Sequence, residues 1–154
     1  MEKKTDKNVY TMLFAIGMVV VVGSILAFIA SSLKPKIDEN KRIEKQQNIL
    51  YAMGVHENDE SSVAFVSDDK VDDEFSKYIT KQLVITNGTS AEENDQAYLI
   101  DIKKEQSKAK DGEERRLPLF VGEKDGKTFY VAPIRGKGLW DAVWAYVAMD
   151  ENMV

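Results

Sequence analysis

An uncharged apolar run near the amino terminus constrains this chain of 154 residues more than any other feature. Residues 8–33 carry no charged side chain, and residues 9–33 are almost entirely apolar. A helix of about 20 consecutive apolar residues is long enough to cross the roughly 30 Å hydrocarbon layer of a bilayer. We therefore predict a transmembrane helix over 9–33, preceded by a short tail over 1–8.

A cleaved secretory signal is the main alternative for this run. The apolar part of such a signal usually spans about 7–15 residues and ends at a cleavage site of small residues. The letters "AFIASS" could mimic such a site, but the run is too long for a signal, so its length favours a retained anchor. Lysine and arginine counts slightly favour a cytoplasmic carboxyl-terminal domain, but that rule loses force when a long domain follows. Charge therefore leaves the orientation open.

The charged composition excludes several classes of function. The net charge is −5, and because residues 1–7 contribute +1, residues 34–154 carry −6. Affinity for nucleic acid comes largely from cationic contacts to phosphates, so we expect no nucleic-acid partner. The chain has no cysteine and a single histidine, His56, which excludes disulfides, thiolate chemistry and multi-histidine metal sites. We find no candidate catalytic residue and no metal site.

Residues 34–54 have the pattern of an amphipathic helix next to the membrane. Apolar and amide side chains recur at helical spacing, at Ile43, Gln46, Gln47, Leu50 and Met53. Asp38 is placed to cap the start of this helix, and Gly54 is placed to end it. Two interpretations stay open: a plain linker helix, or a juxtamembrane helix that docks the soluble domain on its neighbours.

Residues 55–154 indicate an α+β domain with a mainly antiparallel, twisted sheet. We predict a loop over 56–62, a helix over 71–83 that leads into a short strand at 83–86, and a turn at "NGTS". The alternation in "QAYLIDIKKE" predicts a strand over 96–105, followed by a charged loop, "SKAKDGEERR". In "LPLFVGEKDGKTFYVAPI", two strand-forming runs flank an Asp-Gly pair, which predicts a hairpin.

A glycine- and tryptophan-rich segment, "IRGKGLWDAVWAYVAM", follows the hairpin. Its spacing predicts a glycine loop and then a short helix, with Trp140 and Trp144 one turn apart. One interpretation is a core helix with packed tryptophans, which the spacing alone favours. The other is a loop that cradles a flat or phosphorylated ligand. Gly136 and Gly138 permit unusual backbone conformations and close approach, and cationic side chains stand beside them.

The chain resembles a known family in three segments that occur in order. They are "KQQNILYAMGV", "FSKYITKQLVITNG" and "YVAPIRGKGLWDAVWAYVAMD", and they follow an amino-terminal apolar span. Together they resemble the family of the C subunit of the sodium-translocating NADH:quinone reductase and, less closely, the G subunit of the Rnf electron-transport complex. The segment "GKGLWDAVWAYVAMD" is the most specific of the three.

The resemblance implies a bacterial inner-membrane protein with one amino-terminal helix and an extracytoplasmic flavin domain. Such proteins carry FMN bound covalently through a phosphoester to a threonine in a Ser/Asp-Gly-Ala-Thr motif. The flavin relays electrons in a multi-subunit complex that couples NADH oxidation and quinone reduction to sodium export. Its expected partners are therefore the other membrane subunits of the complex and the lipid bilayer. Gly136, Gly138, Leu139 and Trp140 are our candidate cofactor-binding residues.

The sequence departs from the family pattern at the point of attachment. It contains no Gly-Ala-Thr, and none of its threonines has the right neighbours; these are Thr5, Thr11, Thr80, Thr86, Thr89 and Thr128. Asp150, Glu151 and Asn152 predict a turn, after which Met153 and Val154 would begin a returning strand. We therefore expect 55–154 to be the amino-terminal portion of an FMN-binding-type domain that is incomplete at its carboxyl end. The alternative functions are a membrane-anchored interaction domain without cofactor and an Rnf-type electron-transport subunit.

Overall fold

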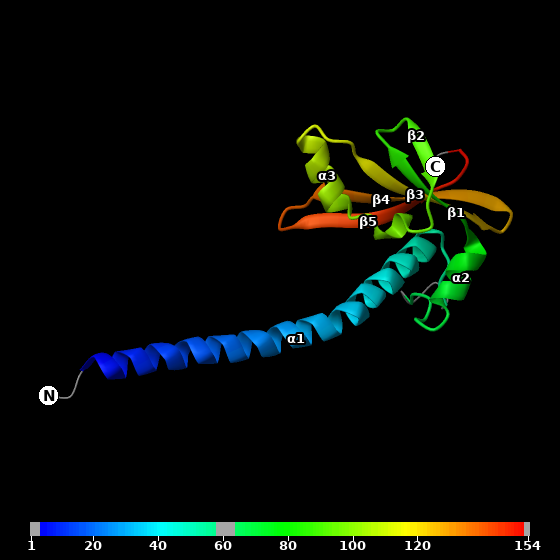
Figure 1. Ribbon diagram of the computed structural model, residues 1–154. Helices are drawn as coiled ribbons and strands as arrows, with labels where there is room; N and C mark the ends of the chain where they lie inside the picture. The colour runs from blue at the N-terminus through cyan, green and yellow to red at the C-terminus, as the bar shows by residue number, and fades with distance from the viewer. Residues whose placement is uncertain (1–3, 58–63, 153–154) are drawn as a thin grey trace. The chain divides into compact units, whose positions relative to one another are not determined.

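The computed structural model describes residues 4–57 and 64–152 and divides the chain into two units, Met1–Asn40 and Lys41–Val154. Figure 1 labels the helices and strands. In chain order they are α1 (Lys4–Ala52), α2 (Val71–Tyr78), β1 (Ile79–Thr86), β2 (Ser90–Glu93), the 3₁₀ helix η1 (Ala97–Leu99), α3 (Ile102–Lys110), β3 (Arg116–Lys124), β4 (Lys127–Lys137) and β5 (Ala142–Met149). The predicted loop over 56–62 and the predicted returning strand at 153–154 lie mostly outside the described residues.

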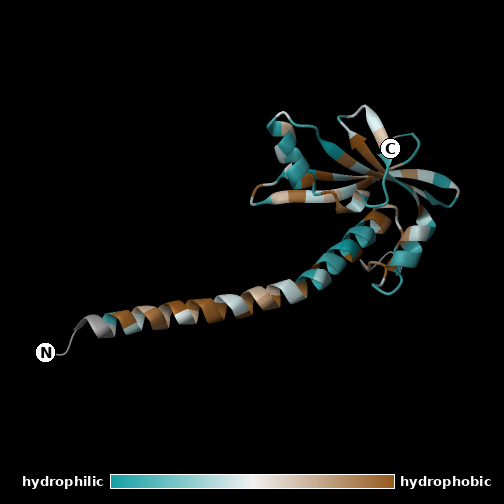
Figure 2. Cartoon of the chain, viewed as in Figure 1, coloured by the Kyte–Doolittle hydropathy of each residue, from teal (hydrophilic) through white to brown (hydrophobic). Residues whose placement is uncertain are grey.

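The first unit contains the apolar part of α1. Large apolar side chains between Val9 and Leu33 are exposed. The hydropathy colouring in Figure 2 shows this part of the helix as largely hydrophobic. Among the described residues, α1 is the one helix long and apolar enough to cross a membrane. The expected apolar helix is therefore confirmed. The predicted helix start at Asp38 is wrong, because α1 continues through Pro35 and Asp38 to Ala52. It does so although proline has no backbone N–H to donate to the helical hydrogen bonds.

The last turns of α1 belong to the core of the second unit. Ile49 and Leu50 are fully buried there, and Gly54 ends the helix in the left-handed conformation that favours glycine, as predicted. The Nζ of Lys45 donates to the backbone oxygen of Tyr98 at 2.7 Å. Arg42 makes an ion pair with Asp72 at the start of α2. These turns are therefore part of the domain itself and not a linker.

The five strands form one sheet in the order β2-β1-β3-β4-β5, and all neighbours are antiparallel. The predicted α+β class with an antiparallel sheet is confirmed. A three-residue connection over 87–89, which contains Asn87-Gly88, joins β1 to β2, and the two-residue turn Asp125-Gly126 joins β3 to β4. All four residues have positive φ, between 50° and 73°, as the tight turn of a twisted hairpin requires. The predicted turn and hairpin at these positions are therefore confirmed.

Residues 96–105 do not form the strand that their alternation suggests. They fold into η1 and the start of α3. The side chain of Asp101 caps α3, accepting hydrogen bonds from the backbone nitrogens of Lys103 at 2.9 Å and Lys104 at 3.3 Å. This cap decides the local structure, and α3 extends into the segment expected to be a charged loop. The helix expected over 71–83 is also shorter, because α2 ends at Tyr78 and β1 begins at Ile79.

The helix predicted after Gly138 is wrong, because these residues form β5. Its pairing with β4 runs from Lys137↔Ala142 to Tyr130↔Met149. Both alternating sets of side chains in "AVWAYVAM" are apolar, so helical and strand spacings match equally well. Backbone pairing with the otherwise free edge of β4 then favours a strand. The predicted turn at its end is confirmed, since the backbone nitrogen of Asn152 donates to Asp150 Oδ1 at 2.9 Å.

One face of the sheet, which we call the covered face, carries the core. Val84, Phe120 and Val131 lie on it and are buried. Helices pack there: the rings of Phe75 in α2 and Phe120 lie 6.5 Å apart, and Glu105 of α3 accepts from Arg116 at the start of β3. Every buried strand residue in the described part of the chain lies on this face.

The opposite face, which we call the open face, is apolar too. Side chains alternate along a strand, so the neighbours of the buried residues point to this side. None of the thirteen apolar residues that the described strands place on this face is buried; they are Leu83, Ile85, Ala91, Leu117, Leu119, Val121, Tyr130, Ala132, Ile134, Val143, Ala145, Val147 and Met149. The sheet therefore has two apolar faces, and the helices cover one.

Candidate functional site

The four predicted cofactor-binding residues come together at the β4–β5 hairpin. Gly136 lies in β4 and pairs with Val143, while the other three lie in the loop 138–141. The backbone nitrogen of Gly138 donates to the carbonyl oxygen of Asp141 at 2.9 Å, which closes the loop. The carboxylate of Asp141 also accepts from the backbone nitrogen of Ala142 at 2.6 Å. We call residues 136–141 the hairpin tip.

The two glycines of the tip have different roles, and neither adopts a positive φ. A Cβ at Gly138 would lie 2.5 Å from the carbonyl oxygen of Asp141 and 2.8 Å from a methyl group of Val143. Gly138 therefore makes room for the tip itself. A Cβ at Gly136 would have no neighbour within 4 Å, so its backbone is open to an approaching group. The space that a ligand would need is thus present at Gly136, and the part of either glycine in ligand binding stays a prediction.

Leu139 and Trp140 are the most exposed large side chains of the tip, at 92% and 96%. Trp144 on β5 is 58% exposed. The interpretation of both tryptophans as buried core residues is therefore wrong. Exposed apolar side chains that cluster in this way typically mark an interaction site. The indole of Trp140 offers a flat face on which a planar ring could stack.

The cations near the tip are not equivalent. Arg135 Nη1 donates to Gln106 Oε1 at 3.0 Å, and Gln106 Nε2 donates to the carbonyl oxygen of Arg135 at 3.0 Å. Arg135 thus holds α3 against β4. Lys137 is exposed at the end of β4 and is the cation placed to meet an anionic group at the tip.

These residues fit one wall of a flavin site and do not enclose one. Trp140 could stack on a flavin ring, and the backbone at Gly136 leaves room beside it. A ring that stacked there would keep its other face in solvent, because both apolar side chains of the loop point away from the core. The attachment motif is also missing from the sequence.

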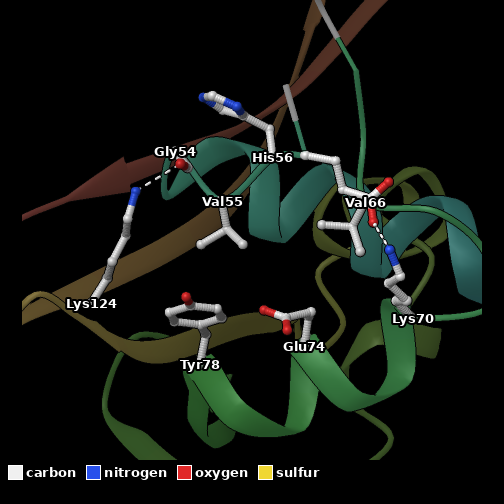
Figure 3. A pocket seen from close by; sticks show the side chains of 9 residues that line it. Gly54, Val55, His56, Val66, Lys70, Glu74, Tyr78 and Lys124 are labelled. Carbon is white, nitrogen blue, oxygen red and sulfur yellow. Dashed lines mark hydrogen bonds and ion pairs between the residues drawn. The ribbon is translucent and has the colours of Figure 1, made fainter. Parts of the chain in front are cut away.

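A separate pocket of about 390 Å³ lies where the end of α1 meets α2 and the end of β3 (Figure 3). It is lined by Gly54, Val55, His56, Glu57, Val66, Lys70, Glu74, Tyr78 and Lys124. The Nζ of Lys124 donates to the carbonyl oxygen of Gly54 at 2.6 Å. This hydrogen bond gives a partner to a backbone acceptor just after the end of α1. A hydrogen bond from Lys70 to Glu57 lowers the pKa of Glu57 and raises the pKa of Lys70. Lys70, Lys124 and Glu57 are thus engaged in contacts that stabilise the fold.

This pocket and the hairpin tip lie at opposite ends of β4. Lys124 pairs with Lys127 at the first residue of β4, whereas the tip follows the last residue, Lys137. At a strand rise of about 3.3 Å per residue, the two ends are about 33 Å apart. The sequence has no local pattern for this pocket, because its lining comes from α2, β3 and the segments 54–57 and 66–70.

Comparison with known proteins gives a consistent result. No family model matches the chain. The C subunit of the Na⁺-translocating NADH-quinone reductase from Haemophilus ducreyi is 31% identical over 153 residues, which covers 94% of this chain and 59% of that protein. The same subunit from Pseudomonas aeruginosa is 27% identical over 163 residues, and that from Vibrio alginolyticus is 25% identical over 172 residues. These matches cover 96% and 99% of this chain.

A solved structure supports the fold. The crystal structure of the C subunit from Parabacteroides distasonis superposes with a TM-score of 0.61 at 23% identity, covering 78% of this chain and 52% of that one. The chain spans about three fifths of the length of the curated relatives. Over nearly its whole length, this chain is a homologue of the C subunit of the Na⁺-translocating NADH-quinone reductase, an oxidoreductase complex.

Proposed function

We propose that this chain acts as a membrane-anchored subunit of a sodium-pumping NADH:quinone oxidoreductase and relays electrons through covalently bound FMN. The match to the Haemophilus ducreyi protein over 94% of the chain is the observation that carries this proposal. The relatives are named as one subunit of a larger complex, so the expected partners are its other membrane subunits.

The apolar part of α1 supplies the anchor in this proposal. Its exposed side chains over 9–33 suit a hydrocarbon environment, and its length suits a single crossing. The domain that follows the anchor is placed on the extracytoplasmic side of a bacterial inner membrane, on the strength of the family resemblance. Lysine and arginine counts do not favour this orientation, so a topology measurement on the full chain is a useful independent check.

FMN, when bound, supplies the redox chemistry, and the protein contributes position and burial. In this chain, Trp140 would stack on the ring and Gly136 would admit it to the strand backbone. Gly138 would hold the loop in shape. The attachment threonine would have to come from outside these 154 residues, because the sequence lacks the motif.

The proposal is tested on the native product, purified from its own membrane in mild detergent. The first measurement is flavin fluorescence of the denatured band together with its intact mass. We expect a fluorescent band with a mass excess of one phosphoester-linked FMN, and co-purification of the other reductase subunits. A dark band at the 17.4 kDa of this chain, without those subunits, would contradict the proposal.

A membrane-anchored interaction domain without cofactor is the second candidate. It is favoured by the exposure of Leu139 and Trp140 and by the apolar open face, which suit a protein partner as well as a cofactor. The two candidates differ in one result. Reductase subunits that co-purify with a dark band would favour the interaction domain, whereas a fluorescent band would favour the flavoprotein.

A further inference from the structure

The pocket where the end of α1 meets α2 and the end of β3 has the size of a small-molecule site, and the proposed redox function does not use it. Its volume of about 390 Å³ falls within the roughly 300–1,000 Å³ that is typical of ligand pockets. Two buried valines, Val55 and Val66, contribute apolar surface. Figure 3 shows the ring of Tyr78 facing the same space. The pocket can therefore hold the apolar body of a small molecule.

The charges that line the pocket are not all neutralised within it. Lys70 and Glu57 form an ion pair at 2.9 Å and match each other. Glu74 pairs instead with Lys77 at 3.3 Å, and Lys77 is an exposed residue that does not line the pocket. A long ion pair in contact with solvent is weak. The carboxylate of Glu74 is therefore able to accept a stronger hydrogen bond from a ligand.

Lys124 has N–H donors that the fold does not use. Its Nζ donates to the carbonyl oxygen of Gly54 at 2.6 Å and reaches that of Met53 only at 3.4 Å. An ammonium group has three N–H donors, so at least one is left for another acceptor. No carboxylate in the described part of the chain forms an ion pair with Lys124. An anionic group of a ligand would therefore meet a cation whose charge is not yet matched.

The charges of Glu74 and Lys124 stand at different places along α2. Glu74 and Tyr78 are one helical turn apart on the same side of the helix, which is about 6 Å along its axis. Lys124 lies near the Tyr78 end, because β3 pairs Gly122 with Ile79 and continues past that pair to Lys124. In Figure 3, Lys124 and Glu74 stand on opposite sides of Tyr78. The two charges are therefore separated by roughly 6 Å or more, with an aromatic ring between them.

We propose that this pocket binds a small linear zwitterion of about the size of a dipeptide, with its ammonium group at Glu74 and its carboxylate at Lys124. The apolar body of the ligand lies against Val55, Val66 and Tyr78. The spacing disfavours a free α-amino acid, because both of its charged groups stand on one carbon atom. A ligand with a single charge would leave Glu74 or Lys124 without a partner. This inference is independent of flavin binding and of the hairpin tip.

The test titrates the full chain, purified in mild detergent, with 6-aminohexanoate. This probe is a linear zwitterion whose charged groups stand at the two ends of an alkyl chain. Hexanoate and hexylamine are matched probes with one charge each, and glycine is a zwitterion with both charges on one carbon atom. Isothermal titration calorimetry should show saturable binding of 6-aminohexanoate at one site per chain. Its affinity should be at least about tenfold higher than that of each matched probe.

Two glutamates provide matched variants. Glu74→Gln removes the charge at the pocket and keeps the size of the side chain, whereas Glu123→Gln changes an exposed carboxylate that does not line the pocket. Glu74→Gln should weaken the binding of 6-aminohexanoate at least about tenfold, because a charged hydrogen bond is lost. It should also make hexanoate bind about as well as 6-aminohexanoate, since the ammonium group no longer has an anionic partner. Glu123→Gln should change neither affinity.

Three results would overturn the proposal. One is the absence of saturable binding to the parent chain when amide exchange of β3 shows that the domain is folded. Another is equal affinity of the parent chain for hexanoate and 6-aminohexanoate, which would mean that Lys124 holds an anion without help from Glu74. The third is equal weakening by the two glutamine variants. None of these measurements depends on FMN, so the proposed redox function can fail while this site stands, and the reverse.

Discussion

The two faces of the sheet are built from the same strands and similar side chains but have different surroundings. Phe120 of β3 points to the covered face and is fully buried against Phe75. Its neighbour Leu119 points to the open face and is partly exposed. The difference lies in what packs on each side and not in the hydrophobicity of the strand. Apolar character therefore marks both a core and a surface that a partner can cover.

This comparison predicts its largest effect at Phe120. Phe120→Ala removes a fully buried ring from the covered face and should lower the free energy of unfolding of the domain by about 3–5 kcal/mol. Leu119→Ala, one residue away on the open face, should cost only about 1 kcal/mol. Urea-dependent hydrogen exchange of β4 amides in the full chain measures both. Equal costs would show that the two faces are not distinct in this chain.

Glu105 of α3 provides the next test, because it is a buried carboxylate that ties a helix to the covered face. Its side chain is about 4% exposed and accepts from Lys108 Nζ at 2.9 Å and from the backbone nitrogen of Arg116 at 2.9 Å. Burial opposes ionisation, but these hydrogen bonds outweigh it and hold the pKa below 4.5. The carboxylate therefore stabilises the fold above the pKa that it has in the unfolded chain. That contribution is lost as the pH falls through the lower, folded pKa.

Glu105→Gln should lower the free energy of unfolding by about 2 kcal/mol at neutral pH, because Lys108 and Arg116 lose their charged partner. It should also flatten the loss of stability below about pH 4.5. Glu113→Gln, at an exposed carboxylate after α3, is the matched control and should have little effect. Acid titrations of the two variants that coincide would mean that α3 is not held by Glu105.

The two glycines of the hairpin tip allow an effect on folding to be compared with an effect on the proposed ligand binding. Gly138→Ala should cost about 2 kcal/mol, because the added methyl group meets the backbone at Asp141. Gly136→Ala, two residues away in open space, should change stability by less than about 0.5 kcal/mol. Amide exchange of β5 measures both. If Gly136→Ala alone also lowers flavin loading, Gly136 faces the ligand; unchanged loading would remove it from the candidate site.

Elements with strong local rules could be predicted from the sequence. The apolar length of 9–33 indicated the long helix, and Asp125-Gly126 indicated the β3–β4 hairpin with its positive φ angles. Elements whose side chains are apolar on both faces could not be predicted in this way. The segment 142–149 matches helical and strand spacing equally well, and only the edge of β4 decides between them.

The candidate site was predictable in its location and not in its surroundings. The segment rich in glycine and tryptophan does gather Gly136, Gly138, Leu139 and Trp140 in one loop. Their exposure could not be predicted, because aromatic side chains at helical spacing usually indicate a core. The two glycines also differ in the space around them, because of contacts across the hairpin. Such contacts have no local sequence pattern.

The smallest effect at neutral pH is expected at Tyr146, which tests whether the covered face extends onto β5. Its side chain points to the covered face opposite Pro133, and burial raises its pKa to about 12, with a smaller contribution from Glu44 on α1. A raised pKa means that the folded chain holds this proton more tightly than the unfolded chain. The stabilisation is therefore full below about pH 10 and is lost as the pH rises toward 12.

Tyr146→Phe should leave stability at pH 7 within about 0.5 kcal/mol, since only a hydroxyl is lost. It should remove part of the fall in stability between pH 10 and 12, seen as a difference between variant and parent. An ultraviolet titration should show one phenol fewer among those that ionise late. If the variant and parent lose stability in parallel, Tyr146 is open to solvent and the helix layer ends at β4.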